Sequence, residues 1–196
     1  MSAVAERASG PGDEELVRRV RAGDDRAFAV LVERHGPLVH RVARRIVGPQ
    51  EAEDVAQDAF LRAYHRLGQY TGEGAFAAWL LRITRNTALH ALERRAARPV
   101  AADDGDEAVA GLPAPGTPAD ALQSRERIER LEAKLRLLRD EHRVVLVLRD
   151  VEGLSYADVA AITDAPIGSV KGRLHRARGE LIELLRRNTY DWELPA

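Results

Sequence analysis

The sequence predicts an all-α protein with two helical domains joined by a flexible acidic linker. Apolar residues recur at spacings of three and four along most of the chain, the period of an amphipathic helix. This period is interrupted once, over residues 98–119, where Ala, Asp, Gly and Pro dominate. We therefore expect a disordered tail (1–12), a first domain (13–97), a linker (98–119), a second domain (120–188) and a C-terminal tail (189–196).

The composition favours a soluble protein of the cytoplasm. Hydrophobic residues make up 45% of the 196 residues and charged residues 31%. No apolar run approaches the roughly 18 residues of a membrane span, and the N-terminus lacks the apolar segment of a signal peptide. We expect no membrane association, and the absence of cysteine excludes disulfides and thiolate metal sites.

Nothing in the sequence indicates catalysis. The six histidines do not have metal-ligand spacing, and the chain contains neither a phosphate-binding glycine loop nor a nucleophile elbow. We therefore predict a protein that is not an enzyme, with no catalytic residue, metal or cofactor.

In the first domain we expect a series of amphipathic helices. A short helix follows Asp13 and ends at Gly23, and a second is expected to end at Gly36-Pro37, where a third begins. Longer helices are expected at 50–67 and from Phe76 to about Ala97. In the helix at 50–67 we assign Leu61 and Tyr64, among others, to the core.

Charge is segregated between these last two helices, although the net charge of the chain is only −1. Residues 51–58 contain acids and no base, and residues 79–98 contain several arginines and a single acid, Glu93. This separation indicates two different partners.

Aromatic residues lie on or beside the glycine-rich segment 68–74, next to the arginine-bearing helix. They are Tyr70, Phe76 and Trp79. Aromatic rings stack on unpaired bases while guanidinium groups neutralise the phosphate backbone, so this combination suits single-stranded or melted nucleic acid. Packing in the core is an equal alternative for Trp79.

The second domain ends in a predicted helix-turn-helix. Helix is expected from near Asp120 and again around 144–148. Ser155 and Asp158 form a capping box that begins the next helix, and Pro166 opens another after a break. The last helix has an apolar stripe and an opposite face that is small or basic, which suits the major groove of DNA. An amphipathic helical hairpin with a solvated charged face is the alternative.

Both domains resemble the extracytoplasmic-function (ECF) sigma factors of bacterial RNA polymerase. The run AEDVAQDAFLRAY at 52–64, with residues 76–80 and 83–86, is similar to their region 2. Residues 145–156 and 168–178 are similar to their region 4. The two motifs occur in the family's order, with a linker and no third domain between them.

The resemblance implies a role for each surface. Region 2 of the family docks on the β′ clamp helices of core polymerase and also recognises and melts the −10 element. Region 4 docks on the β flap and reads the −35 element in duplex DNA. The corresponding residues are Asp54, Gln57, Asp58 and Phe60 for the polymerase, Tyr70, Phe76, Trp79, Arg82 and Asn86 for the −10 element, and Ser169, Lys171, Arg173 and Arg176 for the −35 element.

The family further implies an anti-sigma partner and a linker directed toward the catalytic cleft of the polymerase, although a simple solvated spacer explains the acidity of the linker equally well. Two departures concern the helix-turn-helix. Asp164 stands where a glycine commonly ends its first helix, and Gly172 where serine is common in its second. The competing interpretation is a stand-alone dimeric helix-turn-helix regulator that binds operator DNA without polymerase.

Overall fold

The computed structural model describes residues 10–97 and 128–187, and within these ranges the protein is helical and contains no strand. The predicted linker, most of both predicted tails and the helical start expected near Asp120 lie outside the described residues. The elements are α1 (Asp13–Arg21), α2 (Asp25–Val47), α3 (Pro49–Arg66), η1 (Leu67–Gln69), α4 (Phe76–Ala97), a helical segment at 128–136, α6 (Asp140–Leu146), the π-type turn η2 (Val147–Val151), α7 (Tyr156–Thr163) and α8 (Ile167–Arg186).

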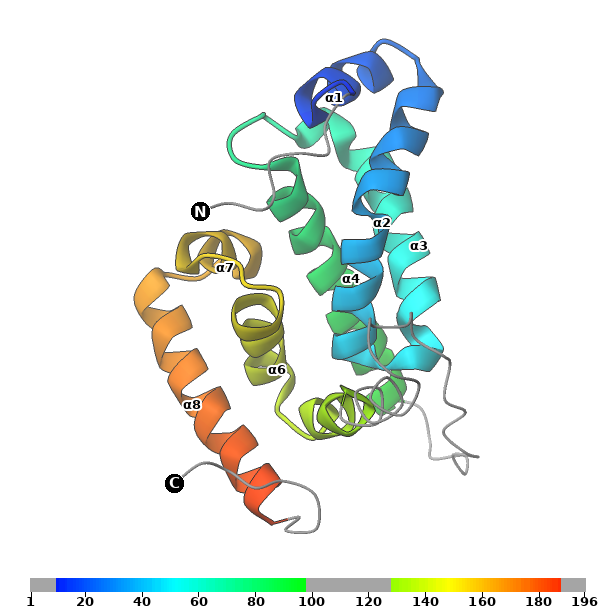
Figure 1. Ribbon diagram of the computed structural model, residues 1–196. Helices are drawn as coiled ribbons and strands as arrows, with labels where there is room; N and C mark the ends of the chain where they lie inside the picture. Colours follow the sequence, from blue (N-terminus) through cyan, green and yellow to red (C-terminus); the bar gives the residue numbers. More distant parts are fainter. Residues whose placement is uncertain (1–9, 98–127, 188–196) are drawn as a thin grey trace, which may run out of the picture.

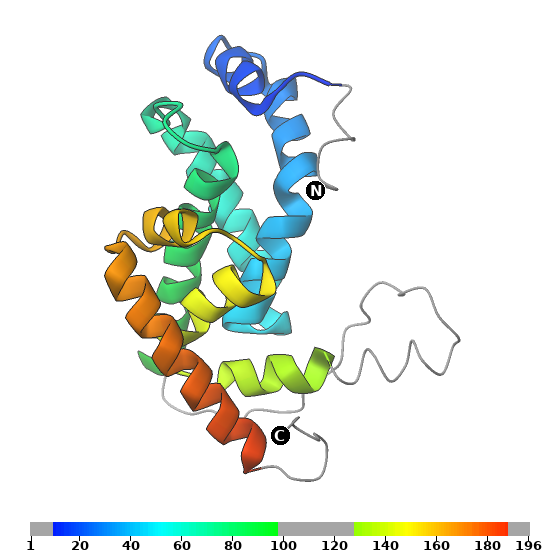
Figure 2. The ribbon, with the colours of Figure 1, turned by 60° about the vertical axis from the view of Figure 1, so that its left-hand side comes forward.

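Helices α2, α3 and α4 run alongside one another and form the body of the first domain, with α1 across one end (Figure 1). The second domain does not stand apart from this body. Helix α7 lies against α4, and α6 with η2 lies against α2, so the two domains form one packed unit (Figures 1 and 2).

The predicted break at Gly36-Pro37 is wrong, because α2 continues through Pro37 to Val47. Proline removes one backbone hydrogen bond and usually kinks or ends a helix. Here Leu31 and Val39, one on each side of Pro37, are both fully buried in the same cluster. The apolar stripe therefore continues across the proline, and burial of both halves outweighs the lost hydrogen bond.

The predicted capping box at the start of α7 is confirmed. The amide of Asp158 donates to the Ser155 hydroxyl at 3.1 Å, and the Ser155 amide donates to the Asp158 carboxylate at 3.2 Å. The predicted inward stripe of α8 is confirmed at Val170, Leu174 and Ala177, which are buried, but not at Ile167, which is 45% exposed. These local signals position the helix-turn-helix as the sequence predicts.

Two hydrophobic clusters hold the helices together. One lies within the first domain and joins α1, the N-terminal half of α2, α3, η1 and the start of α4. The other crosses the domain boundary, because it contains Ile46 of α2 and Leu92 of α4 together with Val145 of α6 and Ile162 of α7. The second domain thus shares its core with the first.

A buried guanidinium closes this shared core. Arg143 is 3% exposed, donates hydrogen bonds to four backbone carbonyls and lies 3.2 Å from the Asp140 carboxylate. Three acceptors belong to the preceding turn, Leu135 at 2.9 Å, Arg136 at 2.6 Å and Leu138 at 2.9 Å. The fourth, the Ile46 carbonyl at 2.5 Å, belongs to α2. Burial lowers the pKa of this guanidinium, and the four bonds compensate for the loss of water.

Arg143→Met should therefore destabilise the fold by about 3 kcal/mol, because it leaves buried carbonyl oxygens without donors. The free energy of unfolding from urea denaturation measures this loss. Arg62→Met is the matched control, since Arg62 is exposed on α3 and its change should stay within about 0.5 kcal/mol. Equal stability of the two variants would contradict the structural role of Arg143.

Candidate protein and nucleic-acid interfaces

The outer face of α3 carries the residues expected to bind a protein partner. Asp54 and Gln57 are exposed, and Asp58 and Phe60 are half-buried. The side-chain amide of Gln57 donates to Glu53 one turn earlier at 2.9 Å, which fixes its orientation on this face. The four predicted residues therefore lie on one accessible side of one helix.

The assignment of Leu61 and Tyr64 to the core is wrong, because their side chains are 57% and 39% exposed. With Phe28 of α2 and Phe60 they line a shallow apolar groove between α2 and α3. The Tyr64 hydroxyl donates to the Asp25 carboxylate at 2.7 Å, and this bond raises the pKa of the hydroxyl. The spacing of apolar residues in the sequence does not distinguish Leu61 and Tyr64 from core residues. Their exposure is a feature of the packing, because Phe28 and Phe60 cover them only in part.

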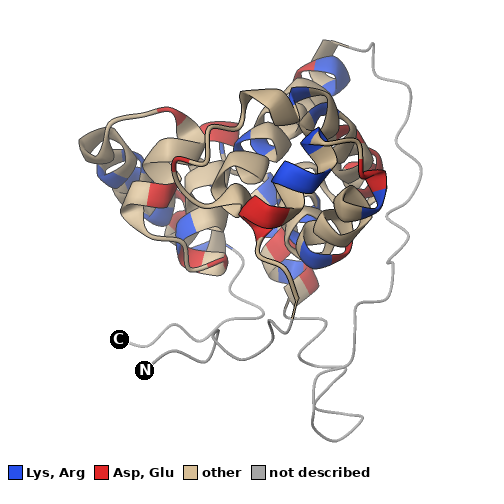
Figure 3. Cartoon of the chain, turned by 90° about the horizontal axis from the view of Figure 1, so that it is seen from above, with Lys and Arg blue, Asp and Glu red and all other residues tan. Residues whose placement is uncertain are grey.

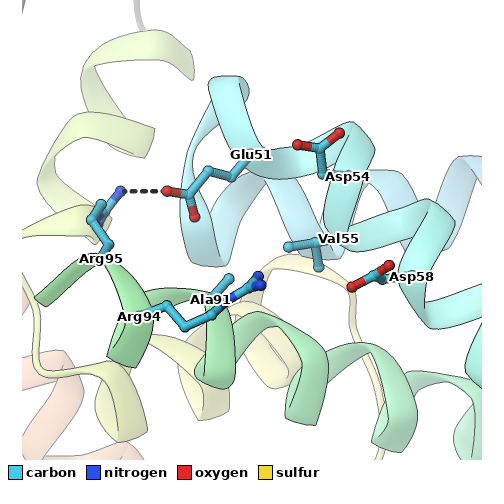
Figure 4. Close-up of a pocket in the computed structure, with 7 residues that line it drawn as sticks. All are labelled: Glu51, Asp54, Val55, Asp58, Ala91, Arg94 and Arg95. Carbon is cyan, nitrogen blue, oxygen red and sulfur yellow. Dashed lines mark ion pairs between the residues drawn. The ribbon is translucent and has the colours of Figure 1, made fainter. Parts of the chain in front are cut away.

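At the other edge of the same face, acids meet arginines of α4. A cavity of about 230 Å³ lies between the two helices. Asp54 and Asp58 lie on its α3 side and Arg94 on its α4 side (Figure 4). Glu51 lies 3.9 Å from Arg95. Within the described residues Asp54 and Asp58 have neither a hydrogen bond nor an ion pair, so their carboxylates are available to a cationic group of a partner.

The aromatic residues expected to stack on bases form a cluster, but two of them are buried. Tyr70 and Phe76 are 4% and 2% exposed, and their ring centroids lie 5.5 Å apart. Trp79 packs 5.5 Å from both rings and remains partly exposed. In this conformation only Trp79 offers a surface to nucleic acid, while Tyr70 and Phe76 support it from below.

The loop before α4 is held by backbone contacts. Arg21 of α1 donates to the carbonyls of Leu67, at 2.7 Å, and of Tyr70. The Tyr70 hydroxyl donates to the Gly74 carbonyl at 2.9 Å. Gly72 and Gly74 adopt positive φ angles of 83° and 84°, which residues with a side chain rarely adopt. These contacts hold Trp79 in place at the start of α4.

One face of α4 brings the predicted arginine and asparagine together. Arg82 and Asn86 are exposed, and they line a polar cleft with Trp79. Arg85 lies in the same cleft and donates to the Asn86 side chain at 3.0 Å. The spacing 82, 85, 86 places all three on one helical face, a signal from which Arg85 could have been included in the predicted site.

The cleft has a wall from the second domain. Asp164, which ends α7 in the left-handed conformation with φ of 51°, lies opposite these residues. Burial, and next the nearby positive charge of Arg173, lower the pKa of Arg85, while Glu141 and Asp164 oppose this effect. Two more lining residues, Arg66 and Gln69, come from the end of α3 and from η1, and sequence pattern gave no signal for them.

The basic face of α8 is divided. Ser169, Lys171 and Arg176 are exposed, as a DNA-binding face requires, and the Lys171 ammonium lies 5.6 Å from the centre of the Tyr156 ring. Arg173 is turned aside, because its side chain is 28% exposed and lies 3.4 Å from Glu141. The described residues thus present three of the four predicted −35 contacts to solvent.

Arg178, a further arginine of this helix, is not available to DNA without losing a strong partner. Its guanidinium makes two hydrogen bonds to Asp150, at 2.8 and 2.7 Å, and these raise its pKa. The bidentate pair links the end of the π-type turn η2 to α8 and helps to orient the recognition helix.

Comparison with known proteins covers both domains. The sigma-70 region 2 family matches residues 31–98, and the sigma-70 region 4 family matches residues 128–181. The RNA polymerase sigma-H factor of Pseudomonas aeruginosa is 38% identical over 185 residues, which cover 89% of this chain and 94% of that protein. The chain belongs to the ECF sigma factors. The ECF sigma-E factor of Escherichia coli K12 is 36% identical over 172 residues, covering 85% of this sigma factor and 90% of that protein.

Solved structures give the same assignment. CnrH, in complex with the cytosolic domain of CnrY, matches with a TM-score of 0.67 and 30% identity over 90% of this sigma factor and 99% of CnrH. The sigma factor RpoE of Bartonella quintana, solved with the anti-sigma factor NepR, matches with a TM-score of 0.63 and 27% identity over 81% of this chain and 96% of RpoE. A stand-alone regulator is not favoured, because the similarity extends over both domains.

Two further features are absent from the described ranges, 10–97 and 128–187. No helix there is long and apolar enough to cross a membrane. No group of three or more His, Cys, Asp or Glu side chains in these ranges is placed to hold a metal ion.

A buried histidine beneath the aromatic cluster predicts a pH dependence. His35 is 9% exposed, lies 5.3 Å from the Phe76 ring and contacts Asp13 at 2.9 Å. Burial lowers its pKa below the ordinary value of 6.5, against the opposing effect of Asp13. Since the folded state disfavours the charged form, the stabilising contribution of neutral His35 is present above pH 6.5 and is lost as the pH falls below that value.

We expect His35→Gln to reduce the loss of stability between pH 7.5 and pH 5.5, because glutamine does not titrate. Urea denaturation of both proteins at both pH values measures the difference. The exposed His175 provides the control, since His175→Gln should leave the pH dependence unchanged. An identical acid loss in wild type and His35→Gln would show that His35 does not control it.

Proposed function

We propose that this sigma factor binds core RNA polymerase in the cytoplasm and directs promoter-specific initiation by recognising the −35 and −10 elements and promoting strand opening. The observation that carries the proposal is the placement of charge on particular helices. Acids and bases both occur on each half of the molecule (Figure 3), but the outer face of α3 is acidic and apolar while the outer faces of α4 and α8 are basic.

In the proposed complex α3 contacts the β′ clamp helices through Asp54, Gln57, Asp58 and Phe60. The exposed Leu61 and Tyr64 extend this surface with apolar area, as the centre of a protein interface requires. The free carboxylates of Asp54 and Asp58 would receive positive charges of the partner. Region 4 would dock on the β flap.

The two DNA-reading surfaces are small. We propose that Trp79, Arg82 and Asn86 bind the melted −10 strand, with Tyr70 and Phe76 as their support, and that Ser169, Lys171, Arg173 and Arg176 read the −35 duplex. Each surface alone makes few contacts, so its affinity for DNA is low. Core polymerase would hold the two at a defined separation and thereby raise the effective concentration of the second contact.

We further propose that an anti-sigma factor regulates this chain. CnrH and the Bartonella RpoE, both similar to it over most of their length, were solved in complex with CnrY and NepR respectively. A partner that covers the same faces would exclude polymerase or DNA.

Asp58→Arg should weaken binding to core polymerase at least about tenfold, because it places a cation beside Arg94 on a surface proposed to receive cations. Fluorescence anisotropy with labelled sigma factor and core enzyme gives the affinity. Glu93→Arg makes the same charge change on α4, where the side chain is 72% exposed and outside the proposed surface, and should bind normally. Normal affinity of Asp58→Arg would refute the role of the acidic face.

Arg176→Ala should lower transcription from a promoter that depends on its −35 element by about 5- to 100-fold, the usual cost of 1–3 kcal/mol for one base or phosphate contact. Core binding should not change, since Arg176 is exposed on α8. In vitro transcription with core enzyme measures the effect. His175→Ala alters the neighbouring exposed position and should have a smaller effect, and equal activity of wild type and Arg176→Ala would exclude Arg176 as a −35 contact.

A further inference from the structure

The −10 surface of this chain borders the second domain, although Arg82 and Asn86 themselves remain exposed. The cleft that contains Arg82, Arg85 and Asn86 on α4 has Asp164 of the helix-turn-helix as its opposite wall. Helix α7 packs across α4, as Figures 1 and 2 show. A melted DNA strand that entered the cleft beside Arg85 and Asn86 would meet this wall.

We propose that the free chain is autoinhibited: region 4 closes on region 2 and blocks the −10 surface, and Glu152 locks this closed form by binding Arg41 and Arg45. The inference rests on the proposed function for the meaning of the −10 surface. It adds a regulatory step that this chain carries within itself, because separation of the two domains must precede binding of melted DNA.

Glu152 is placed for this role by the turn before it. The π-type turn η2 ends with a hydrogen bond from the Glu152 amide to the Val147 carbonyl at 2.9 Å, and this wide turn directs the side chain at α2. The carboxylate is 6% exposed, lies 3.2 Å from Arg41 and is also bonded to Arg45. Both of its side-chain partners belong to region 2.

Two other polar contacts cross the boundary. Arg143 bonds to Ile46 of α2 and also to three carbonyls of its own domain, so its loss would disturb region 4 itself. Glu132 receives a bond from Arg44 at 3.1 Å. Glu152 binds two arginines of region 2, whereas Glu132 binds one, and we therefore assign the lock to Glu152.

The closed form also contains an element that favours opening. Arg85 of region 2 and Arg173 of region 4 lie close enough for each charge to affect the other, in a partly buried setting where repulsion is weakly screened. Burial is the main cause of the lowered pKa of Arg85, Arg173 adds to it, and Glu141 and Asp164 oppose it. A phosphate chain or an acidic partner that separated the two arginines would relieve the repulsion.

The lock therefore sets the fraction of molecules that can bind melted DNA. When the competent state is a small fraction of the population, the apparent affinity falls by that fraction. In the closed form the side chain of Arg45 is only 19% exposed, so removing the charge of Glu152 leaves it without its counter-charge. The open form does not pay this cost, because there the two residues are apart. The open fraction, and with it the affinity for single-stranded DNA, should rise by about tenfold, which corresponds to about 1.4 kcal/mol.

The test uses the full chain alone, without polymerase. Because the protein contains no cysteine, spin labels can be attached to Arg62→Cys on α3 and Ile182→Cys on α8, both exposed positions. Wild type should give a single narrow distance distribution. Glu152→Arg, which places a third cation beside Arg41 and Arg45, should give longer distances, and Arg45→Glu in the same chain should shorten them again.

Binding of a short fluorescent single-stranded DNA of random sequence provides the functional readout. Glu152→Gln and Arg45→Gln should each raise its affinity about tenfold, whereas Glu183→Gln, which removes an exposed acid of α8, should not. A wild-type chain that is already open, or a Glu152→Arg chain that stays closed, would overturn the lock. Opening without any gain in DNA binding would overturn the blocking of the −10 surface. Neither result depends on whether the chain binds core polymerase.

Discussion

The guanidinium of Arg143 donates hydrogen bonds to carbonyl oxygens of both domains, and the packing of the second domain against the first depends on these bonds. It is buried, so every N–H that it presents must find an oxygen, and the oxygens within reach are carbonyls of both domains and the Asp140 carboxylate. This requirement fixes α6 against α2. The position of α6 then determines where η2 ends, where Glu152 points and how α7 lies across α4.

This packing gives a physical reason why a sigma factor of this construction would be inactive on its own. Arg85 of the proposed −10 surface and Arg173 of the proposed −35 surface come near each other at the boundary, and two such arginines need acids between them. Glu141 and Asp164 supply these acids at the boundary, beside Arg173 and Arg85. The proposed polymerase complex solves the same electrostatic problem by separating the surfaces and giving each one DNA as its counter-charge.

The sequence predicted the helices and the recognition element well, because their signals are local. The capping box at Ser155, the inward stripe of α8 and the bounds of α4 need only neighbouring residues. The sequence-based prediction was wrong where contacts between residues far apart in the chain determine the structure. The passage of α2 through Pro37 depends on a shared core, and the burial of Tyr70 depends on packing from α1 and α4. The spacing of apolar residues in the sequence did not indicate that region 4 packs against region 2.

Asp164 satisfies the local backbone requirement for a left-handed residue at the end of α7 and also acts electrostatically on Arg85 of the other domain. The end of α7 needs a left-handed residue, which glycine satisfies at the least cost and aspartate satisfies more readily than most others. Aspartate also brings a carboxylate, and the turn directs it into the cleft beside Arg85. The departure from the common glycine therefore leaves the helix-turn-helix intact while it gives the closed form a negative charge where melted DNA would otherwise bring its phosphates.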